Sequence, residues 1–333
     1  MRRVVVGLIG LISVMGLIFP GEKLVEASSP DFSVQAVLPE SQTNERVSYF
    51  DITLEPKQEE ILAVQVTNNS EAEMTLDIGV NTATTNSNGV INYGFSDADP
   101  DDTLPINFAE IVELDEKTIT LTANETRTVE AKVVMPEKSF DGILLGGITV
   151  SEQVPENENQ ITNRFSYSLA VVINQTDKDV SPTVDLTQVT VNQRNRRSVV
   201  IGSLQNQAAT ILNDVHVEAQ VFEKGSDAPI YTETRSDMRM APNSTLPFGI
   251  STGTKPLKAG KYQLKMVVTS GEEEWRFEKE FTITAKEAKE FNEQAVNLET
   301  DRTAVYLAIA GGVVVLLLFV IAWLVYSKQK ISR

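Results

Sequence analysis

Residues 61–67 read Ile61-Leu62-Ala63-Val64-Gln65-Val66-Thr67 and lead into the turn-forming triplet Asn68-Asn69-Ser70. Apolar and β-branched residues dominate this segment, as they do in strands that pack against a pleated, half-buried surface. Short segments of the same kind, separated by turn residues, recur along the chain from Asp31 onward. Short strands at such regular spacing are typical of β-sandwiches, so the sequence predicts an all-β fold.

The first half of the chain contains further segments of this type, at 32–37, 47–54, 74–80, 126–134, 143–150 and 165–173. Asn88-Gly89 adds a strong hairpin signal, because both residues tolerate positive φ. The polar segment 176–182 then contains a proline and few apolar residues, which is typical of a boundary between domains. We therefore predict a first β-sandwich over residues 28–178.

The second half repeats the pattern, with predicted strands at 184–191, 198–204, 215–222, 230–234, 246–250, 262–269 and 275–284. Seven short strands with turns about every 8–12 residues indicate an immunoglobulin-like sandwich, predicted over residues 179–285. The period then changes, because Ala288, Phe291, Ala295 and Leu298 recur at helical spacing. Residues 286–303 are therefore predicted to form a short amphipathic stalk helix.

Both ends of the chain are apolar. Residues 305–325 carry no charge and would reach roughly 30 Å as a helix, so we predict one transmembrane helix over residues 304–326. A basic tail, residues 327–333, follows it, which places the C-terminus in the cytoplasm. Residues 1–27 have the pattern of a secretory signal peptide, with a retained second membrane helix as the alternative. The predicted location is the plasma membrane, crossed once, with the ectodomain outside in the cell wall.

Composition narrows the possible chemistry. The chain has a net charge of −17, no cysteine and one histidine, His216. Such an acidic surface argues against nucleic acid as a partner. Without cysteine or a second histidine, thiol, triad and zinc chemistry lack their residues. His216 lies between two valines of an alternating segment and is predicted to face solvent, so we predict no catalytic residue, no metal ligand and no cofactor.

Two segments leave alternatives open. Residues 97–101 have the alternate-acid spacing of a calcium loop, but Asp102 stands where glycine is required and Phe108 where glutamate is required. A solvated acidic loop is the simpler interpretation of this segment. Residues 135–148 place three glycines around an apolar run. They form either a tight hairpin entering a buried strand or an open edge that receives a glycan or another strand.

Several motifs, taken in order, resemble those of the WxL-interacting proteins of Gram-positive bacteria. They are Phe32-Ser33-Val34, Tyr49-Phe50-Asp51-Ile52, Phe140-Asp141-Gly142-Ile143, Leu145-Gly146-Gly147-Ile148, Met240-Ala241-Pro242-Asn243-Ser244 and Trp275-Arg276-Phe277. Similar sequences tend to carry glycine where this chain has Lys57. The resemblance implies an amino-terminal peptidoglycan-binding domain, a second domain called host-binding, a membrane anchor, and partnership with WxL-domain surface proteins.

These observations predict a non-catalytic, membrane-anchored surface adaptor. Its expected partners are peptidoglycan, WxL-domain surface proteins and host extracellular-matrix proteins. Aromatic faces beside amide and carboxylate groups suit sugar rings and peptide stems. On that basis the predicted peptidoglycan-binding residues are Asn88, Tyr93, Phe140 and Asp141. Two alternatives remain: a cell-wall glycosidase using the carboxylates of Asp99 and Glu110, and a membrane-tethered chaperone that lends a strand to surface proteins.

Overall fold

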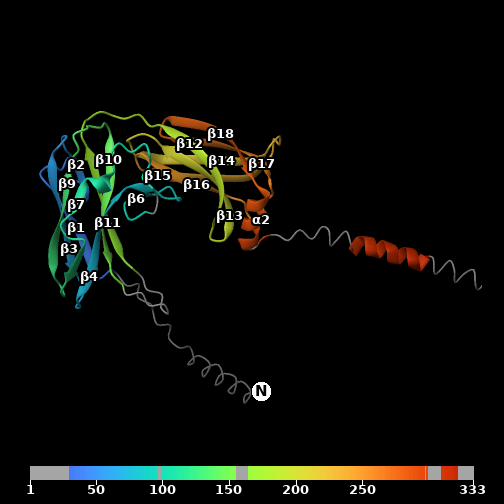
Figure 1. Ribbon diagram of the computed structural model, residues 1–333, viewed down its shortest axis with the longest axis horizontal. Helices are drawn as coiled ribbons and strands as arrows, with labels where there is room; N and C mark the ends of the chain where they lie inside the picture. Colours follow the sequence, from blue (N-terminus) through green and yellow to red (C-terminus); the bar gives the residue numbers. More distant parts are fainter. Residues whose placement is uncertain (1–29, 97–98, 155–163, 297, 299–308, 322–333) are drawn as a thin grey trace, which may run out of the picture.

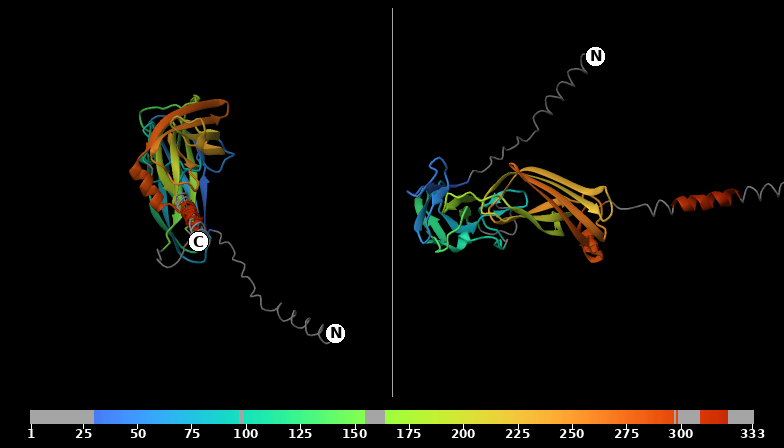
Figure 2. Two further views of the ribbon diagram at one scale, coloured as in Figure 1. Left: turned by 90° about the vertical axis from the view of Figure 1, so that its right-hand side faces the viewer. Right: turned by 90° about the horizontal axis from the view of Figure 1, so that it is seen from above.

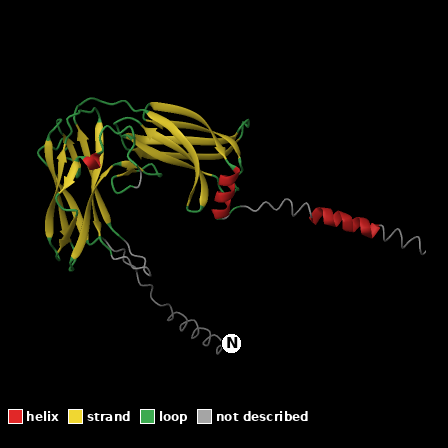
Figure 3. Cartoon of the chain, viewed as in Figure 1, coloured by secondary structure: helices red, strands yellow, loops and turns green. Residues whose placement is uncertain are grey.

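The computed structural model describes residues 30–96, 99–154, 164–296, 298 and 309–321. Two β-sandwiches lie beside each other, joined by loops (Figures 1 and 3). Outside one 3₁₀ turn, every regular element among the described residues from Phe32 to Ile283 is a strand. The all-β prediction for this part of the chain is confirmed.

The first unit contains two facing sheets. One has the order β1-β3-β9-β7, and the other has the order β2-β11-β10-β4-β8. The bounds are β1 (Phe32–Val37), β2 (Phe50–Thr53), β3 (Glu59–Asn68), β4 (Met74–Thr82), β7 (Val112–Leu114), β8 (Thr118–Leu121), β9 (Thr126–Val134), β10 (Ile143–Glu152) and β11 (Ser166–Asn174), with the 3₁₀ helix η1 at Phe108–Glu110. Alternate side chains meet in one core, in which Phe50, Ile52 and Phe108 are each 0% exposed.

The second unit has a three-stranded sheet, β12-β13-β16, facing a four-stranded sheet, β15-β14-β17-β18. Its strands are β12 (Val184–Arg194), β13 (Arg197–Asn206), β14 (Leu212–Glu223), β15 (Pro229–Met240), β16 (Ser244–Ser251), β17 (Gly260–Ser270) and β18 (Glu273–Ile283). A separate core lies between the two sheets, with Phe248, Leu264 and Val217 each 0% exposed. Each unit therefore buries its own apolar side chains.

The two units repeat one structural device. Asn68 at the end of β3 and Asn206 at the end of β13 are both 0% exposed. Each side-chain amide donates to a carbonyl four residues ahead and to a second, distant loop, and each accepts from the backbone two residues ahead. The distant loops end in equivalent turns, in which Asn124 and Asn243 both have positive φ. The same buried amide therefore holds the same loop in both sandwiches.

The units differ at one edge. In the first, the chain between β1 and β3 contributes β2, which pairs in parallel with β11. In the second, β12 turns directly into β13 through Asn195 and Arg196, which both have positive φ. No counterpart of β2 is present among the described strands of the second unit. Its corresponding sheet therefore ends at β18.

A hairpin of the first unit joins the two units. It consists of β5 (Thr84–Thr85) and β6 (Ile91–Asn92), and its tip lies against β15 (Figures 1 and 2). The Arg239 amide donates to the Gly89 carbonyl (2.7 Å), and the Arg235 guanidinium donates to the Ser87 carbonyl (2.9 Å). A small apolar cluster of Ala83, Ile91, Leu145 and Ala241 closes the contact.

The turn before β3 explains the one departure noted from the family pattern. Lys57 has a φ of 64°, the left-handed conformation that glycine adopts at no steric cost. Its ammonium group lies 2.8 Å from the Glu137 carboxylate across the turn. The lysine therefore keeps the turn conformation that glycine would favour.

The predicted stalk helix begins one residue earlier and packs against the second unit. It is α2 (Ala285–Gln294), and Thr284 and Glu287 form a capping box at its start. Ala288 is buried and Phe291 packs against the core, while the Phe291 carbonyl accepts from the Gln193 side chain (2.6 Å). Of the remaining residues predicted to be helical, those at 297 and 299–303 lie outside the described part of the chain.

The prediction of a transmembrane helix is contradicted by the structure. Residues 309–321 of this segment are helical, and the residues on either side lie outside the described part of the chain. Among the described residues, no helix is long and apolar enough to cross a membrane. This finding contradicts both the single-pass anchor and the plasma-membrane location with a cytoplasmic C-terminus. Residues 1–27, predicted as a signal peptide, and the tail 327–333 lie outside the described residues.

A polar pocket between the two sandwiches

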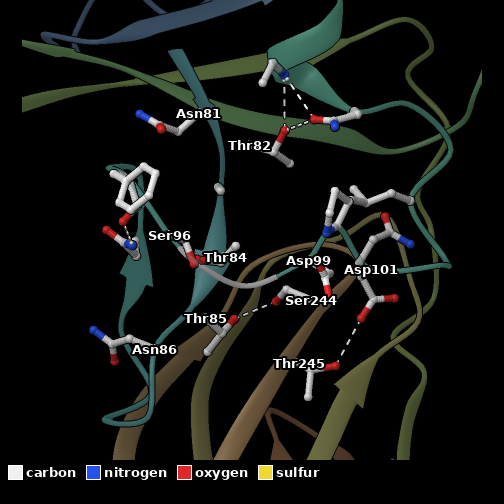
Figure 4. A pocket seen from close by; sticks show the side chains of 18 of the residues that line it. Asn81, Thr82, Thr84, Thr85, Asn86, Ser96, Asp99, Asp101, Ser244 and Thr245 are labelled. Atoms are coloured by element: carbon white, nitrogen blue, oxygen red, sulfur yellow. Dashed lines mark hydrogen bonds between the residues drawn. The ribbon is translucent and has the colours of Figure 1, made fainter. Parts of the chain in front are cut away.

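A pocket of about 320 Å³ opens where the two units meet. The first unit supplies most of its lining, from the end of β4, from β5 and from the loop that follows β6. The second unit supplies Asn243, Ser244 and Thr245 at the start of β16. Figure 4 shows Thr85 and Ser244 pointing toward one another, and Thr245 pointing toward Asp101. The volume is within the range of sites that hold small ligands.

Hydroxyl groups hold the base of the pocket in place. The Thr85 and Ser244 hydroxyls lie 2.6 Å apart and both residues are buried. The Ser244 hydroxyl donates to the Ala241 carbonyl, and the Thr85 oxygen accepts from the Ala241 amide (2.9 Å). Thr85 therefore donates to Ser244 and closes a ring of hydrogen bonds between the units.

The far wall is held by Asp101. Its carboxylate accepts from the side-chain amide of Gln205 (2.8 Å) and from the Thr245 hydroxyl (3.0 Å), both in the second unit. It also accepts from the backbone and hydroxyl of Thr103. The buried Asn243 donates to the Thr103 carbonyl (2.9 Å) and to Gln207. These contacts fix the loop that follows β6 against the second unit, so the pocket is formed in advance of any ligand.

Other polar groups of the pocket remain available. The Asp99 carboxylate is exposed, and it forms no ion pair with another described residue. The Thr84 hydroxyl and the side-chain nitrogen of Asn86 form no hydrogen bond with another described residue. The Asn81 oxygen is also unused, since that side chain only donates, to Thr149. The pocket therefore offers donors, acceptors and one negative charge to a polar ligand.

Phe95 adds an apolar surface to this polar site. The residue lines the pocket, yet it is 78% exposed, more than any other large apolar side chain of the two units. An aromatic ring held at the mouth of an amide- and hydroxyl-lined pocket can stack on the apolar face of a sugar ring. The combination is suited to a ligand that carries both sugars and amides.

The structure brings two of the four predicted binding residues close to the pocket without placing them in its lining. Asn88 is exposed at the tip of the β5–β6 hairpin, next to Gly89, which lies tightly against Met238. Tyr93 is half-buried in the apolar cluster that joins the units, and burial raises the pKa of its hydroxyl. Their role in binding stays a prediction.

The other two predicted residues lie elsewhere. Phe140 is 8% exposed and belongs to the first core, so its ring faces are covered by protein. Asp141 is bound at 2.5 Å by Lys178 and accepts from Thr176, and these hydrogen bonds hold the pKa of the Asp141 carboxyl below its usual range. Neither residue lines the pocket between the units.

The acidic residues considered for glycosidase or calcium chemistry are separated by the fold. Asp99 lines the pocket, but Glu110 does not, and its carboxylate accepts from Asn107 on η1. Asp97 lies outside the described residues. Within the described residues, no group of three or more His, Asp or Glu side chains could hold a metal ion.

His216 makes contacts that sequence reasoning missed. Its Nδ1 lies 2.9 Å from the Ser236 hydroxyl and its Nε2 lies 3.3 Å from the Glu218 carboxylate. All three residues lie on the outer surface of β14 and β15, and the pocket between the units does not include them. They form a cross-strand hydrogen-bond chain on an open strand surface.

Sequence reasoning also missed Phe95 and the residues contributed by the second unit. A lone aromatic residue between Gly94 and a run of polar residues was an available signal for Phe95, because such residues are otherwise rare in solvated loops. Asn243 and Ser244 belong to a motif that the sequence links to the family but to no site. Their position in the pocket follows only from the way the units pack.

Comparison with known proteins gives two kinds of result. Among curated proteins, none matches the chain. Solved structures of chaperones of surface fibres are similar at 9–14% identity. They include the Salmonella enterica SafA pilin in complex with the SafB chaperone (10% identity, 77% of this chain and 99% of that chain, TM-score 0.30). Another is the E. coli chaperone DraB (14% identity, 76% and 98%, TM-score 0.29). Because these TM-scores are well below 0.5, the similarities support no conclusion about this chain.

Family comparison covers most of both units. Residues 32–152 match the peptidoglycan binding domain of the WxL Interacting Protein family. Residues 156–293 match the host binding domain of the same family. The first match covers most of the first sandwich and the acidic loop of the pocket, and the second covers β16, which completes the pocket. The chain therefore belongs to the WxL Interacting Protein family.

Proposed function

We propose that the protein is a non-catalytic adaptor of the bacterial cell surface that holds peptidoglycan in the pocket between its two units. Through its second unit it would hold host extracellular-matrix proteins or WxL-domain surface proteins. The observation that carries the proposal is the pocket itself, which combines unused amide and hydroxyl groups with the exposed ring of Phe95.

Peptidoglycan matches this combination chemically. Its N-acetylated sugars present an apolar ring face beside amide and hydroxyl groups, which suits Phe95 next to Asn81, Thr84 and Asn86. Its stem peptides carry amino groups, which suit the exposed carboxylate of Asp99. Pockets that recognise such ligands pair a stacking surface with a few placed polar groups.

The two units would act as one piece in this function. Hydrogen bonds from Thr85, Asp101 and Asn243 cross between them, so a wall ligand would contact residues of both units. The protein partner would then be displayed at a fixed position relative to the wall. This arrangement suits an adaptor, since force on one unit passes directly to the other.

Sedimentation with purified, insoluble peptidoglycan tests the proposal. The protein is expected to sediment with the wall material and to be released by soluble wall fragments. A protein that stays in the supernatant, or that sediments equally well with cellulose, would remove the proposal. Incubation with the wall material should release no soluble sugar or peptide, as expected for a binding protein.

Phe95→Ala is expected to weaken retention on peptidoglycan by about tenfold, because stacking on an aromatic ring contributes on the order of 1 kcal/mol beyond area burial. The measurement is the fraction of protein bound across a range of wall concentrations. Ile61→Ala is the matched control, because Ile61 is 50% exposed on β3 and does not line the pocket. Equal losses in the two variants would contradict a stacking role for Phe95.

A further inference from the structure

We propose that the free edge of β18 is a docking site for an extended segment of a partner protein, which adds a fifth strand to the sheet β15-β14-β17-β18. The segment would carry bulky apolar residues at alternate positions and basic residues at its amino-terminal end. The inference deepens the proposed protein-binding role of the second unit, and it depends on that role.

The first unit shows what such a strand looks like. There β2 pairs in parallel with β11, with Phe50 opposite Val171 and Ile52 opposite Ile173. All four side chains are 0% exposed. β2 therefore completes the core at that edge with two apolar residues separated by one polar residue, Asp51.

The second unit has the same edge without the strand. β11 pairs Tyr167 with Val150, and β18 pairs Trp275 with Val268, so the two strands correspond position by position. On this alignment Phe281 takes the place of Ile173. Phe281 packs against the second core but remains partly exposed, whereas Ile173 is fully buried. This partial exposure is what a missing fifth strand would leave.

The other sheet edges of the second unit carry groups that hinder strand addition along at least part of their length. On β16, Pro247 lacks an N–H, and the Pro247 and Gly249 carbonyls accept from Arg194 and Arg235. On β15, the Arg239 amide pairs with the β5–β6 hairpin. On β12, the register shifts between Leu186 and Gln188, and the carbonyls of Leu186 and Thr187 accept from Lys279. Bulges, prolines and covering groups of this kind prevent strand addition.

The outer backbone of β18 has no bulge and no proline. It pairs with β17 over Glu273–Ile283 without a register shift. Strand β12 lies close beside β18, and Lys279 bonds to it, but among the described residues no group donates to or accepts from the outer backbone of β18. A long, regular edge with unpaired backbone groups is the geometry used for β-strand addition.

Lys279 occupies the position of Val171 on the inner side of β18, and its ammonium group is already satisfied. It donates to the Leu186 carbonyl (2.9 Å) and the Thr187 carbonyl (2.7 Å) across the gap to β12. An added strand would therefore meet the aliphatic stem of Lys279 rather than a free charge.

The negative charge at the start of β18 indicates which residues the partner segment would carry. Glu272, Glu273 and Glu274 are consecutive and exposed where β18 begins, with Arg276 as the near cation. A parallel strand that continues from the position equivalent to β2 past Trp275 would bring its amino-terminal residues next to Glu273 and Glu274, so basic residues are favoured there. A second copy of this chain, with its net charge of −17, fits this edge less well.

The test uses the full-length protein and a synthetic peptide that joins four lysines to a copy of residues 48–54, so that the lysines extend alongside residues 273–276. Amide hydrogen exchange of β18 is expected to slow at least tenfold when the peptide is added. A control peptide with serine in place of the copies of Phe50 and Ile52 should leave exchange unchanged. Glu273→Lys combined with Glu274→Lys should weaken peptide binding about fivefold, since each exposed charge pair contributes modestly. Thr232→Lys on β15 is the matched control and should have no effect.

Three outcomes would overturn the proposal: no protection of β18, protection of a different edge, or protection of β18 in the protein alone together with dimers in sedimentation. The last outcome would identify a second copy as the occupant. Retention on peptidoglycan is measured on the same preparation, because it reports on the pocket and not on β18. A protein that keeps wall retention but never protects β18 would refute the strand-addition proposal and leave the wall-binding function standing.

Discussion

Phe108→Ala is expected to lower the free energy of unfolding by about 3–5 kcal/mol, the cost of removing a large buried aromatic ring. Phe108 is 0% exposed, and its ring lies directly over Gly146 of β10. A Cβ atom built on Gly146 would lie 2.0 Å from that ring, so the ring and the glycine fit only together. Alanine at position 108 would leave a cavity above a residue that has no side chain to fill it.

Urea unfolding followed by far-ultraviolet circular dichroism measures this effect. Phe108→Leu is the matched control and should cost roughly 1–1.5 kcal/mol, because most of the volume is kept. Asn107 and Ala109, on either side, line the pocket, so peptidoglycan retention should also fall in the alanine variant. A loss of less than 1 kcal/mol in the alanine variant would mean that the neighbouring strands close over the cavity.

Asn206→Ala should cost about 3 kcal/mol, since it removes three hydrogen bonds at a fully buried position. The Asn206 side chain donates to the Thr210 carbonyl (2.8 Å) and the Ala241 carbonyl (2.9 Å) and accepts from the Ala208 amide (3.2 Å). Alanine cannot replace these contacts, so the two carbonyls and the amide lose their partner. The loops that it holds lead directly into Asn243 and Ser244 of the pocket.

The same unfolding measurement applies, with Asn192→Ala as the control. Asn192 is exposed, and its side chain accepts only from the Gln193 amide, so its loss should stay within about 0.5 kcal/mol. Asn68→Ala in the first unit should behave like Asn206→Ala, because the two amides make equivalent contacts. If only one of the two substitutions lowered the free energy of unfolding, the two asparagines would not contribute equally to stability.

Sequence pattern located strands well where alternation was long and regular. The predicted strand at 165–173 is β11 at Ser166–Asn174, and the predicted strand at 126–134 is β9. The predicted strand at 47–54 is shorter in the structure, at Phe50–Thr53, because the Tyr49 carbonyl accepts from the Gln42 side chain instead of a neighbouring strand. Side-chain contacts between distant segments set such limits, and alternation does not report them.

The prediction of binding residues has the same limit, because packing decides which aromatic side chains stay exposed. Phe140 has the residue type of a sugar-stacking surface, but packing places its ring in the core, whereas Phe95 remains exposed. Residue type alone cannot separate these cases, because both residues lie near glycines in loops. The membrane-spanning helix was predicted from apolar length alone, and among the described residues no helix is long and apolar enough to cross a membrane.

The sequence by itself determined the all-β class, the turns around asparagine and glycine, and the acidic, cysteine-free surface, because these depend on local periodicity and on residue counts. Only the tertiary structure decided that the loop after β6 meets β16 to form a pocket, and that β18 ends its sheet without a neighbour. Both features depend on which strands lie side by side. Strand pairing joins residues far apart in the chain, and it is selected by the packing of whole sheets rather than by any single segment.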